Sequence, residues 1–358
     1  MKFGDLTKYE ADGQKVMLDF EGRAARIEVL TPYIVNVFGA VEGERTVSKA
    51  IEGDKAVPVS IRTEEEEDGL WIDTGELRVR VGGGFHVDFF GKDGSVLCTD
   101  YRGERKPLQR VSDEFLRLLE SEGHSALTGR HECAFQVVKK LEGSERFYGL
   151  GDKTGFIDKR HYEYEMWNTD NPDPQVDTFK ALYKSIPFFI TLTDTCVYGI
   201  FMDNTYKSYF NMGQESEEYY WFGADGGNLD YYFIAGDSVA RVLERYTYLT
   251  GTCPLPQRWT LGYHQSRWGY MTQEDVEEIA SGMRDNDIPC DVIHFDIDYM
   301  QDYRVFTLNG GRYHNDPEGF FRKIYRGRLK VVTKKIPIPP TRRKKHVTVD
   351  RVDPRGNY

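Results

Sequence analysis

The sequence has no run of about 18 apolar residues, the length that a helix needs to cross a bilayer. Its first residues, Met1–Gln14, include the acidic Asp5 and lack the apolar core of a secretory signal. The five cysteines are an odd number, lie far apart and include no C-x-x-C pair. This is typical of buried thiols in a reducing compartment rather than of disulfides or structural zinc. We therefore expect a cytoplasmic protein with no membrane segment.

Phosphate-binding glycine patterns are also absent. Neither G-x-G-x-x-G nor G-x-x-x-x-G-K-[ST] follows any predicted strand, which argues against a nucleotide cofactor. The net charge of -11 is uneven, because the first 321 residues carry -22 and the last 37 carry +11. The acidic body gives no reason to expect nucleic acid as a partner.

What is present, over residues 1–235, is an alternation of apolar and polar residues. Arg26–Val29, Glu76–Val81 and Phe85–Phe89 alternate in this way, and turn pairs such as Glu21-Gly22 lie between such segments. The period of two predicts antiparallel sheets with one solvated face, and several short strands favour a β-sandwich. We expect an amino-terminal β-sandwich domain over residues 1–235.

A helical period replaces the alternation after Gly236. Ser238 can cap a helix, and Gly251 followed by Pro254 and Pro256 ends it. The apolar residues at helical spacing are Val239, Val242, Leu243, Tyr246 and Leu249. We interpret 236–255 as a helical linker that bridges two domains, with the boundary in Thr250–Pro256.

Strands and helices alternate over residues 256–333. The predicted strands are Trp259–His264, Cys290–Ile297 and Leu329–Thr333. Thr272 with Asp275 forms a capping box for the first helix, and Asp316 with Pro317 begins the second, which ends at Gly327. This order implies a parallel sheet, either in a (β/α)8 barrel or in a doubly wound fold, and the spacing does not decide between them.

Three polar side chains alternate along the second predicted strand. His294, Asp296 and Asp298 are expected on one face, with successive Cα atoms about 6.6 Å apart. The two aspartates could be the acid and the nucleophile of a glycosidase, the ligands of a divalent metal, or groups that bind substrate hydroxyls at the end of a barrel strand. A structural ion pair of Asp298 with Arg304 is a further interpretation. The spacing alone leaves all of these open.

A dense group of polar and aromatic residues follows the first predicted strand, in Gly262–Tyr270. It includes His264 and Trp268. Sugar sites combine aromatic faces for the C–H surface of the ring with polar side chains for its hydroxyls. A single His or Trp after a strand is also common as packing. Both residues are candidates for substrate binding.

Seven motifs follow one another in order between residues 140 and 333. They are Arg146–Asp152, Met166–Pro172, Leu182–Phe189, Tyr198–Thr205, Leu229–Gly236, Leu261–Trp268 and His294–Met300. Together they resemble the family 31 glycoside hydrolases and, within them, the α-glucosidases. Residues 1–140 resemble the galactose mutarotase-like β-sandwich of that family only in general character.

The resemblance implies retaining hydrolysis of α-glucosidic bonds at the non-reducing end of an α-glucoside oligosaccharide. It also implies two catalytic aspartates and no metal or organic cofactor. In this resemblance Asp296 hydrogen-bonds sugar hydroxyls in the subsite of cleavage, Ile297 lines that subsite, and Asp170 lies on a sandwich loop that contacts the next sugar. The metal interpretation of Asp296 and Asp298 is then disfavoured.

The segment that carries the nucleophile in this family, Trp-x-Asp-Met-Asn-Glu, does not occur in the 358 residues, so we assign no catalytic residue. Only 103 residues follow residue 255, whereas a (β/α)8 barrel takes about 250. We expect a β-sandwich followed by the incomplete first part of an α/β (β/α)8 TIM barrel. Its first three βα steps would occupy residues 256–333, followed by an atypical basic tail at 334–358.

Two hypotheses compete for the tail. A reading-frame change near Thr333 would produce an unrelated segment and an early end, whereas a genuine basic tail would recruit nucleic acid or an anionic surface.

We expect this chain by itself to be inactive, because it lacks the nucleophile and the acid. The alternative function is a non-catalytic carbohydrate-binding protein. The preferred sugar stays open, and the sequence is compatible with a homo-oligomer.

Overall fold

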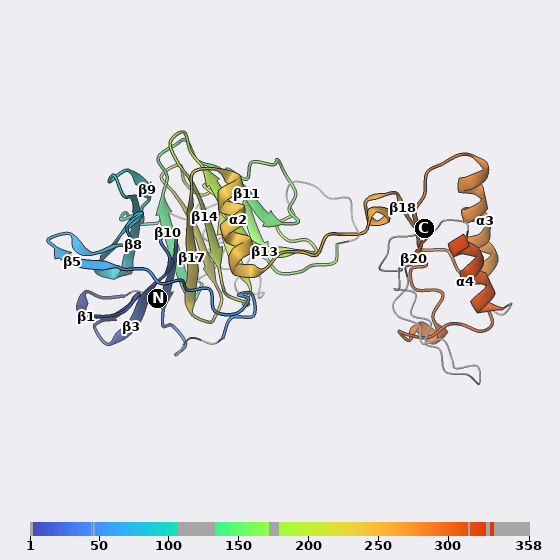
Figure 1. Cartoon of the computed structure of the whole chain (residues 1–358), viewed down its shortest axis with the longest axis horizontal. Coiled ribbons are helices and arrows are strands. Elements are labelled where there is room, and N and C mark those ends of the chain that lie inside the picture. The colour runs from blue at the N-terminus through green and yellow to red at the C-terminus, as the bar shows by residue number, and fades with distance from the viewer. Residues whose placement is uncertain are drawn as a thin grey trace, which may run out of the picture. The chain divides into compact units, whose positions relative to one another are not determined.

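The computed structural model describes residues 3–43, 45, 47–105, 133–171, 179–313, 316–326 and 330–332. The chain divides into two compact units, Met1–Thr252 and Cys253–Tyr358, and each is described by itself (Figure 1). The division falls inside Thr250–Pro256, where the sequence predicts a boundary. The predicted tail at 334–358 and the predicted helix end at Gly327 lie outside the described residues.

The strands described in the first unit form three antiparallel sheets. Sheet A has the order β1-β2-β3-β4-β17-β14-β13-β11, with β1 Leu6–Asp12, β2 Lys15–Phe20, β3 Arg23–Thr31, β4 Ile34–Gly39, β17 Leu229–Gly236, β14 Val197–Met202, β13 Ser185–Leu192 and β11 Arg146–Gly151. Sheet B has the order β5-β6-β7-β8-β9, with β5 Arg62–Glu66, β6 Gly69–Asp73, β7 Leu77–Gly82, β8 His86–Gly91 and β9 Val96–Cys98; the short 3-10 helix η1 is Gly83–Phe85. Sheet C has the order β10-β16-β15-β12, with β10 Phe135–Lys140, β16 Tyr219–Ala224, β15 Ser208–Asn211 and β12 Glu163–Met166.

One hydrophobic core joins the three sheets. Phe89 of sheet B stacks on Phe233 of sheet A with ring centroids 3.8 Å apart, and Phe222 of sheet C meets Tyr231 of sheet A at 5.6 Å. Sheet A therefore forms one layer, and sheets B and C face it across the core. This arrangement confirms the β-sandwich that the period of two predicts.

The helix α2, Val239–Thr250, covers the other face of sheet A (Figure 1). Along β17, Tyr231 and Phe233 belong to the sandwich core, whereas Tyr232 and Ile234 belong to a second cluster with α2. This follows from the period of two, since successive side chains of a strand point to opposite faces. Both faces of β17 are thus buried, which explains its nearly continuous apolar sequence.

The observed cap of α2 confirms the predicted start of this helix. The prediction that the helix bridges two domains is wrong. The Ser238 hydroxyl accepts a hydrogen bond from the Arg241 amide at 3.3 Å, and Gly251 follows the last turn with a positive φ of 84°. The helix does not span between two domains, because Val242 and Leu249 are fully buried against the sandwich. It is part of the first unit, and of the predicted linker 236–255 only the residues after Thr252 fall in the second.

The second unit contains a parallel three-stranded sheet in the order β18-β19-β20, with β18 His264–Ser266, β19 Val292–His294 and β20 Lys330–Val332. The helix α3, Gln273–Asp285, connects β18 to β19, and α4, Pro317–Arg326, connects β19 to β20. Two 3-10 helices, η3 Arg258–Leu261 and η4 Gln301–Tyr303, complete the described elements. This is the strand and helix alternation predicted for 256–333.

Both helix starts in the second unit are confirmed. The Thr272 hydroxyl accepts from the Asp275 amide at 3.2 Å while the Asp275 carboxylate accepts from the Thr272 amide at 2.9 Å, so the capping box is complete. Asp316 accepts from the Gly319 amide at 3.1 Å at the start of α4. Val276, Ala280, Phe320 and Ile324 are buried between the helices and the sheet.

Two predicted strands are shorter in the structure. Residues 259–261 form η3 because the chain turns after Pro256, and the Thr260 amide and hydroxyl both donate to the Gln257 carbonyl, at 3.0 and 2.7 Å. The strand begins only at His264. The second predicted strand, 290–297, is ordered as a strand only from Val292 to His294.

Among the described residues, no helix is long and apolar enough to cross a membrane. All five cysteines are free thiols. Cys98, Cys133 and Cys290 are buried, as expected, but Cys196 is half-buried and Cys253 is exposed, which corrects the expectation that all are buried.

Candidate functional site

The carboxyl edge of the parallel sheet brings two predicted groups together. Strands β18 and β19 run parallel with Ser266 opposite His294, so the residues that follow each strand lie at the same edge. A hydrogen bond of 2.8 Å from the Trp268 indole nitrogen to Asp298 Oδ2 joins these two segments directly.

Asp296 lies just beyond the end of β19 and is exposed. Its backbone is in the left-handed region, with φ 58°, and the next residues form a turn in which the Met300 amide donates to the Ile297 carbonyl at 3.1 Å. The alternation predicted for His294, Asp296 and Asp298 is therefore wrong after His294, because the strand has already ended. The Asp296 carboxylate faces solvent, and Ile297 beside it is 39% exposed.

Asp298 has a different environment, since only 2% of it is exposed. Besides the Trp268 indole, its carboxylate accepts from the Tyr303 hydroxyl at 3.2 Å and pairs with Arg312 at 3.3 Å. The predicted partner Arg304 instead pairs with Asp302 at 3.5 Å. Asp298 thus has the structural role, with Arg312 in place of Arg304.

The buried Asp298 and the exposed Asp296 do not form a pair. One carboxylate is already engaged by an indole, a phenol and a guanidinium, while the other faces solvent. This arrangement fits neither an acid and nucleophile pair nor a shared D-x-D metal site, both of which need two carboxylates directed at one point. The third interpretation, binding of substrate hydroxyls by Asp296, needs no such pair and stays a prediction.

His264 contacts His294 within the sheet. Their Nδ1 and Nε2 atoms are 3.0 Å apart, and both rings are half-buried. Burial lowers the pKa of His294, and repulsion from His264 lowers it further. Among the described residues, the other ring nitrogen of His264, Nε2, is buried without a hydrogen-bond partner. His264 is therefore placed to orient its neighbour, and is less accessible than the sequence prediction implies.

Trp268 is the most exposed large aromatic side chain at this edge, with 71% of its surface accessible. Its indole N–H is held by Asp298, so the orientation of the ring is fixed while its surface stays open. A fixed and accessible aromatic face is what the C–H surface of a sugar ring requires.

Asp170 lies in the first unit, in the segment after β12, and is exposed. The Tyr183 hydroxyl donates to Asp170 Oδ1 at 2.6 Å, and this hydrogen bond raises the pKa of Tyr183. Asp170 is thus oriented by a neighbouring phenol.

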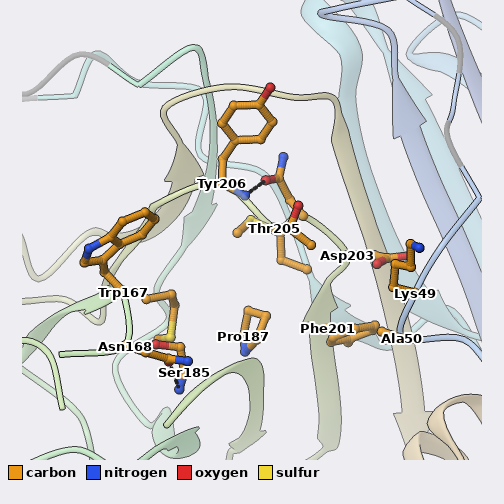
Figure 2. A pocket seen from close by; sticks show the side chains of 13 residues that line it. Lys49, Ala50, Trp167, Asn168, Ser185, Pro187, Phe201, Asp203, Thr205 and Tyr206 are labelled. Carbon is orange, nitrogen blue, oxygen red and sulfur yellow. Dashed lines mark hydrogen bonds between the residues drawn. The ribbon is translucent and has the colours of Figure 1, made fainter. Parts of the chain in front are cut away.

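A hollow of about 570 Å³ lies on the first unit (Figure 2). Its walls come from the end of β12 with Trp167 and Asn168, the start of β13, the segment between β14 and β15, and Lys49–Ala50. Sequence reasoning did not assign a site here. The aromatic and amide residues in the motifs Met166–Pro172 and Tyr198–Thr205 were the available signal.

Comparison with protein families matches residues 24–211 to the glycosyl hydrolase 31 N-terminal galactose mutarotase-like domain. Residues 253–355 match the TIM-barrel domain of glycosyl hydrolases family 31, and this match continues past Thr333, where the motif resemblance was expected to end.

Individual proteins give the same result. The chain is 44% identical over 213 residues to alpha-glucosidase 2 of Bacillus thermoamyloliquefaciens, covering 59% of this chain and 27% of that protein. It is 34% identical over 191 residues to alpha-xylosidase XylQ of Lactiplantibacillus pentosus, covering 52% of this chain and 24% of the other. The chain spans about a quarter of the length of these curated relatives.

Among solved structures, the family 31 dextranase of Flavobacterium johnsoniae in complex with isomaltotriose superposes with a TM-score of 0.77 at 30% identity, covering 93% of this chain and 38% of that one. An alpha-xylosidase from a soil metagenome shares the fold, with a TM-score of 0.69. The sandwich and the parallel βα unit are thus those of a glycoside hydrolase. The chain belongs to glycosyl hydrolase family 31.

Proposed function

We propose that this chain contributes the sugar-binding carboxylate Asp296 to an α-glucosidase that acts on α-glucoside oligosaccharides at their non-reducing end with retention. The exposed Asp296 at the carboxyl end of β19 carries this proposal, since active sites of (β/α)8 enzymes lie at that edge. The similarity to alpha-glucosidase 2 supports the choice of an α-glucoside.

Each candidate residue has a distinct role in this proposal. Asp296 accepts hydrogen bonds from sugar hydroxyls, while Ile297 and Trp268 provide apolar surface for the ring. His264 acts through its contact with His294 and is a positioning residue. Asp170 accepts a hydroxyl of the adjacent sugar, and the Tyr183 phenol holds its carboxylate in place.

Hydrolysis of the glycosidic bond needs catalytic groups in addition to the residues that bind the sugar. The 358 residues contain no Trp-x-Asp-Met-Asn-Glu segment, so the sequence offers no match for the nucleophile of the family. We expect the 358-residue chain to release no chromophore from a chromogenic α-glucoside above the uncatalysed rate, because binding alone supplies neither covalent nor proton-transfer catalysis. Ordinary turnover would contradict this.

The binding role of Asp296 is tested on the purified chain containing fluorotryptophan. Maltose should shift the fluorine NMR signal of Trp268 in a saturable way. In the Asp296→Asn variant we expect binding to weaken about tenfold or more, because a hydrogen bond to a charged acceptor is lost.

Asp302→Asn is the matched control, since Asp302 is also exposed, follows β19 and has a positive φ of 51°. It should bind maltose as the unmodified chain does. Equal weakening in both variants, or no weakening in Asp296→Asn, would remove the basis of the proposal.

A further inference from the structure

The buried carboxylate of Asp298 holds two exposed aromatic rings in the second unit. Its Oδ2 atom accepts from the Trp268 indole nitrogen at 2.8 Å, and its Oδ1 atom accepts from the Tyr303 hydroxyl at 3.2 Å. Trp268 is 71% exposed and Tyr303 is 62% exposed, whereas Asp298 is 2% exposed. One buried acid therefore connects two rings whose faces are open to a ligand.

The hydrogen bonds to Asp298 are the main restraint on these rings. Neither Trp268 nor Tyr303 belongs to the described hydrophobic cluster that packs α3 and α4 on the parallel sheet. Exposed side chains without such packing exchange between rotamers within nanoseconds. Because a hydrogen bond to a charged acceptor is stronger than one to a neutral acceptor, Asp298 gives each ring a preferred orientation.

Arg312 compensates the charge that is buried at Asp298. Its Nη1 atom donates to the Asp298 main-chain carbonyl at 2.8 Å and to the carboxylate Oδ1 at 3.3 Å. The Arg312 amide donates to the Asn309 carbonyl at 3.2 Å, and the following residue, Tyr313, is buried in the cluster of the second unit. A buried carboxylate without a cation would be unfavourable at this position. Arg312 therefore holds the acid in place between the two rings.

The backbone of Tyr303 is strained in the conformation that brings its phenol to Asp298. Its φ is 56°, in the left-handed region that bulky residues rarely adopt. Such conformations persist only where the surrounding contacts fix them. Here the Thr307 hydroxyl accepts from the Gln301 amide at 2.9 Å and donates to the Arg304 carbonyl at 2.6 Å, which closes the segment around Tyr303. The placement of this ring is thus imposed by the fold and not by local preference.

The held rings belong to the edge that carries Asp296. Trp268 follows β18, Asp298 follows β19, and Tyr303 lies in η4, so segments distant in the sequence converge there. Aromatic faces suit the C–H surface of a sugar ring, and side chains that are already ordered lose less entropy when a ligand binds. Asp298 is thus placed to influence affinity although its buried carboxylate is not available to the ligand.

We propose that Asp298 and Arg312 are positioning residues, which hold the rings of Trp268 and Tyr303 in one arrangement and thereby strengthen the binding of a sugar at this edge. Both act through the rings and not by contact with the sugar. Tyr303, which was not among the predicted site residues, supplies a second aromatic surface beside Trp268. The inference rests on the proposed function, because it takes Trp268 as a surface for the sugar ring.

The arrangement of the rings is tested first without ligand. In the full chain containing fluorotryptophan, the Trp268 signal is identified by its loss in Trp268→Phe. Asp298→Ala removes the acceptor of both rings, so fluorine relaxation should report faster motion of the Trp268 ring. The signals of the remaining tryptophans should keep their positions, which shows that the variant is folded. A merely structural role of Asp298 would disturb those signals and not the motion of one ring.

Maltose binding is then measured on the same variants. Asp298→Ala should raise the half-saturating maltose concentration about tenfold, because two side chains must now be ordered when the sugar binds. Tyr303→Phe keeps the ring but removes its bond to Asp298, so we expect an increase of about threefold. Since Tyr303 is exposed, this second variant leaves the packing intact and decides the question if Asp298→Ala does not fold.

Variants of Arg312 test the compensating charge. Arg312→Gln removes it and should speed the motion of the Trp268 ring and weaken maltose binding about threefold. Arg312→Lys should restore both, because one nitrogen of Arg312 makes both contacts to Asp298 and an ammonium can take its place. Asp302→Asn is the control, since this exposed acid precedes Tyr303 in the chain but pairs with Arg304.

Two results would overturn the positioning role. They are unchanged motion of the Trp268 ring in Asp298→Ala, and faster motion with unchanged maltose affinity. Both leave the saturable response of the unmodified chain, and with it the proposed function, intact. The absence of that response in the unmodified chain would reject the proposed function and this inference together, so the unmodified chain distinguishes the two failures.

Discussion

The pair formed by His264 and His294 shows how one contact sets the charge of a side chain. The rings meet at 3.0 Å, and only one of the two nitrogens in that contact can carry the proton. Burial lowers the pKa of His294, and the neighbouring imidazole adds to this by repulsion of a second positive charge. His294 is therefore held neutral where an exposed histidine would begin to ionise.

This neutral state predicts a dependence of stability on pH. The pKa of His294 is lower in the folded chain than in the unfolded one, so the unfolded chain binds the proton first as pH falls. Stability contributed by the neutral ring is present above about pH 6.5, the unfolded value, and is lost as pH falls toward the folded pKa. NMR titration of the imidazole signals should place the midpoint of His294 below that of an unperturbed histidine.

His264→Asn is the informative variant, because the amide can occupy the place of Nδ1 without acquiring a charge. The His294 midpoint should then rise toward the usual value, since the repulsion is gone while partial burial persists. An unshifted midpoint in the unmodified chain, or one that does not move in the variant, would contradict this account.

At this scale the sequence predicted a common direction for three side chains, and the structure does not show it. His294, Asp296 and Asp298 were expected on one face, yet of these three only Asp296 is exposed. The difference arises from a left-handed residue and a turn, which the pattern of polar residues does not encode. The partner of Asp298 was missed because Arg312 is brought near by folding and not by proximity in sequence.

At the scale of elements, helix starts were the most predictable features. The capping box of Thr272 and Asp275 satisfies amides that would otherwise lack partners in the first turn of α3. Such local chemistry is complete within four residues, which is why sequence reasoning finds it. Strand ends are less predictable. Residues 259–261 have a strand-like composition, but they form η3, in which the Thr260 amide donates to the Gln257 carbonyl.

Thr272→Ala should therefore destabilise the second unit by about 1 kcal/mol, because the hydroxyl that accepts from the Asp275 amide is removed. Thr272→Ser keeps the acceptor and should lose much less. Hydrogen exchange of the α3 amides, read by mass spectrometry, measures the difference. Equal protection in the two variants would mean that the cap contributes little here.

At the scale of the whole molecule, none of the described hydrophobic clusters contains residues from both sides of Thr252. The three clusters described in the first unit contain residues no later than Leu249, while the cluster of the second begins at Tyr270. The sandwich was predictable from its period of two. The helix that covers it was predictable as a helix, but its packing depends on apolar residues on the outer face of sheet A, which only the strand register reveals.

A fragment of residues 1–252 should consequently fold by itself and unfold cooperatively in urea, since its core is complete without the second unit. A fragment of residues 1–235 is the comparison, because it lacks α2 and uncovers Phe188, Tyr232 and Ile234. We expect a lower urea midpoint or aggregation for the shorter fragment. Identical midpoints would show that α2 contributes nothing to the sandwich.

The left-handed backbone of Asp296 also limits which amino acids can stand at that position. Aspartate and asparagine are the non-glycine residues that tolerate this conformation best, whereas a longer acid such as glutamate does so less readily. The Asp296→Glu variant keeps the charge but would strain the main chain. It would therefore not test the carboxylate alone. The short acid at this corner thus suits the backbone geometry, and it carries the carboxylate that our proposal assigns to sugar hydroxyls.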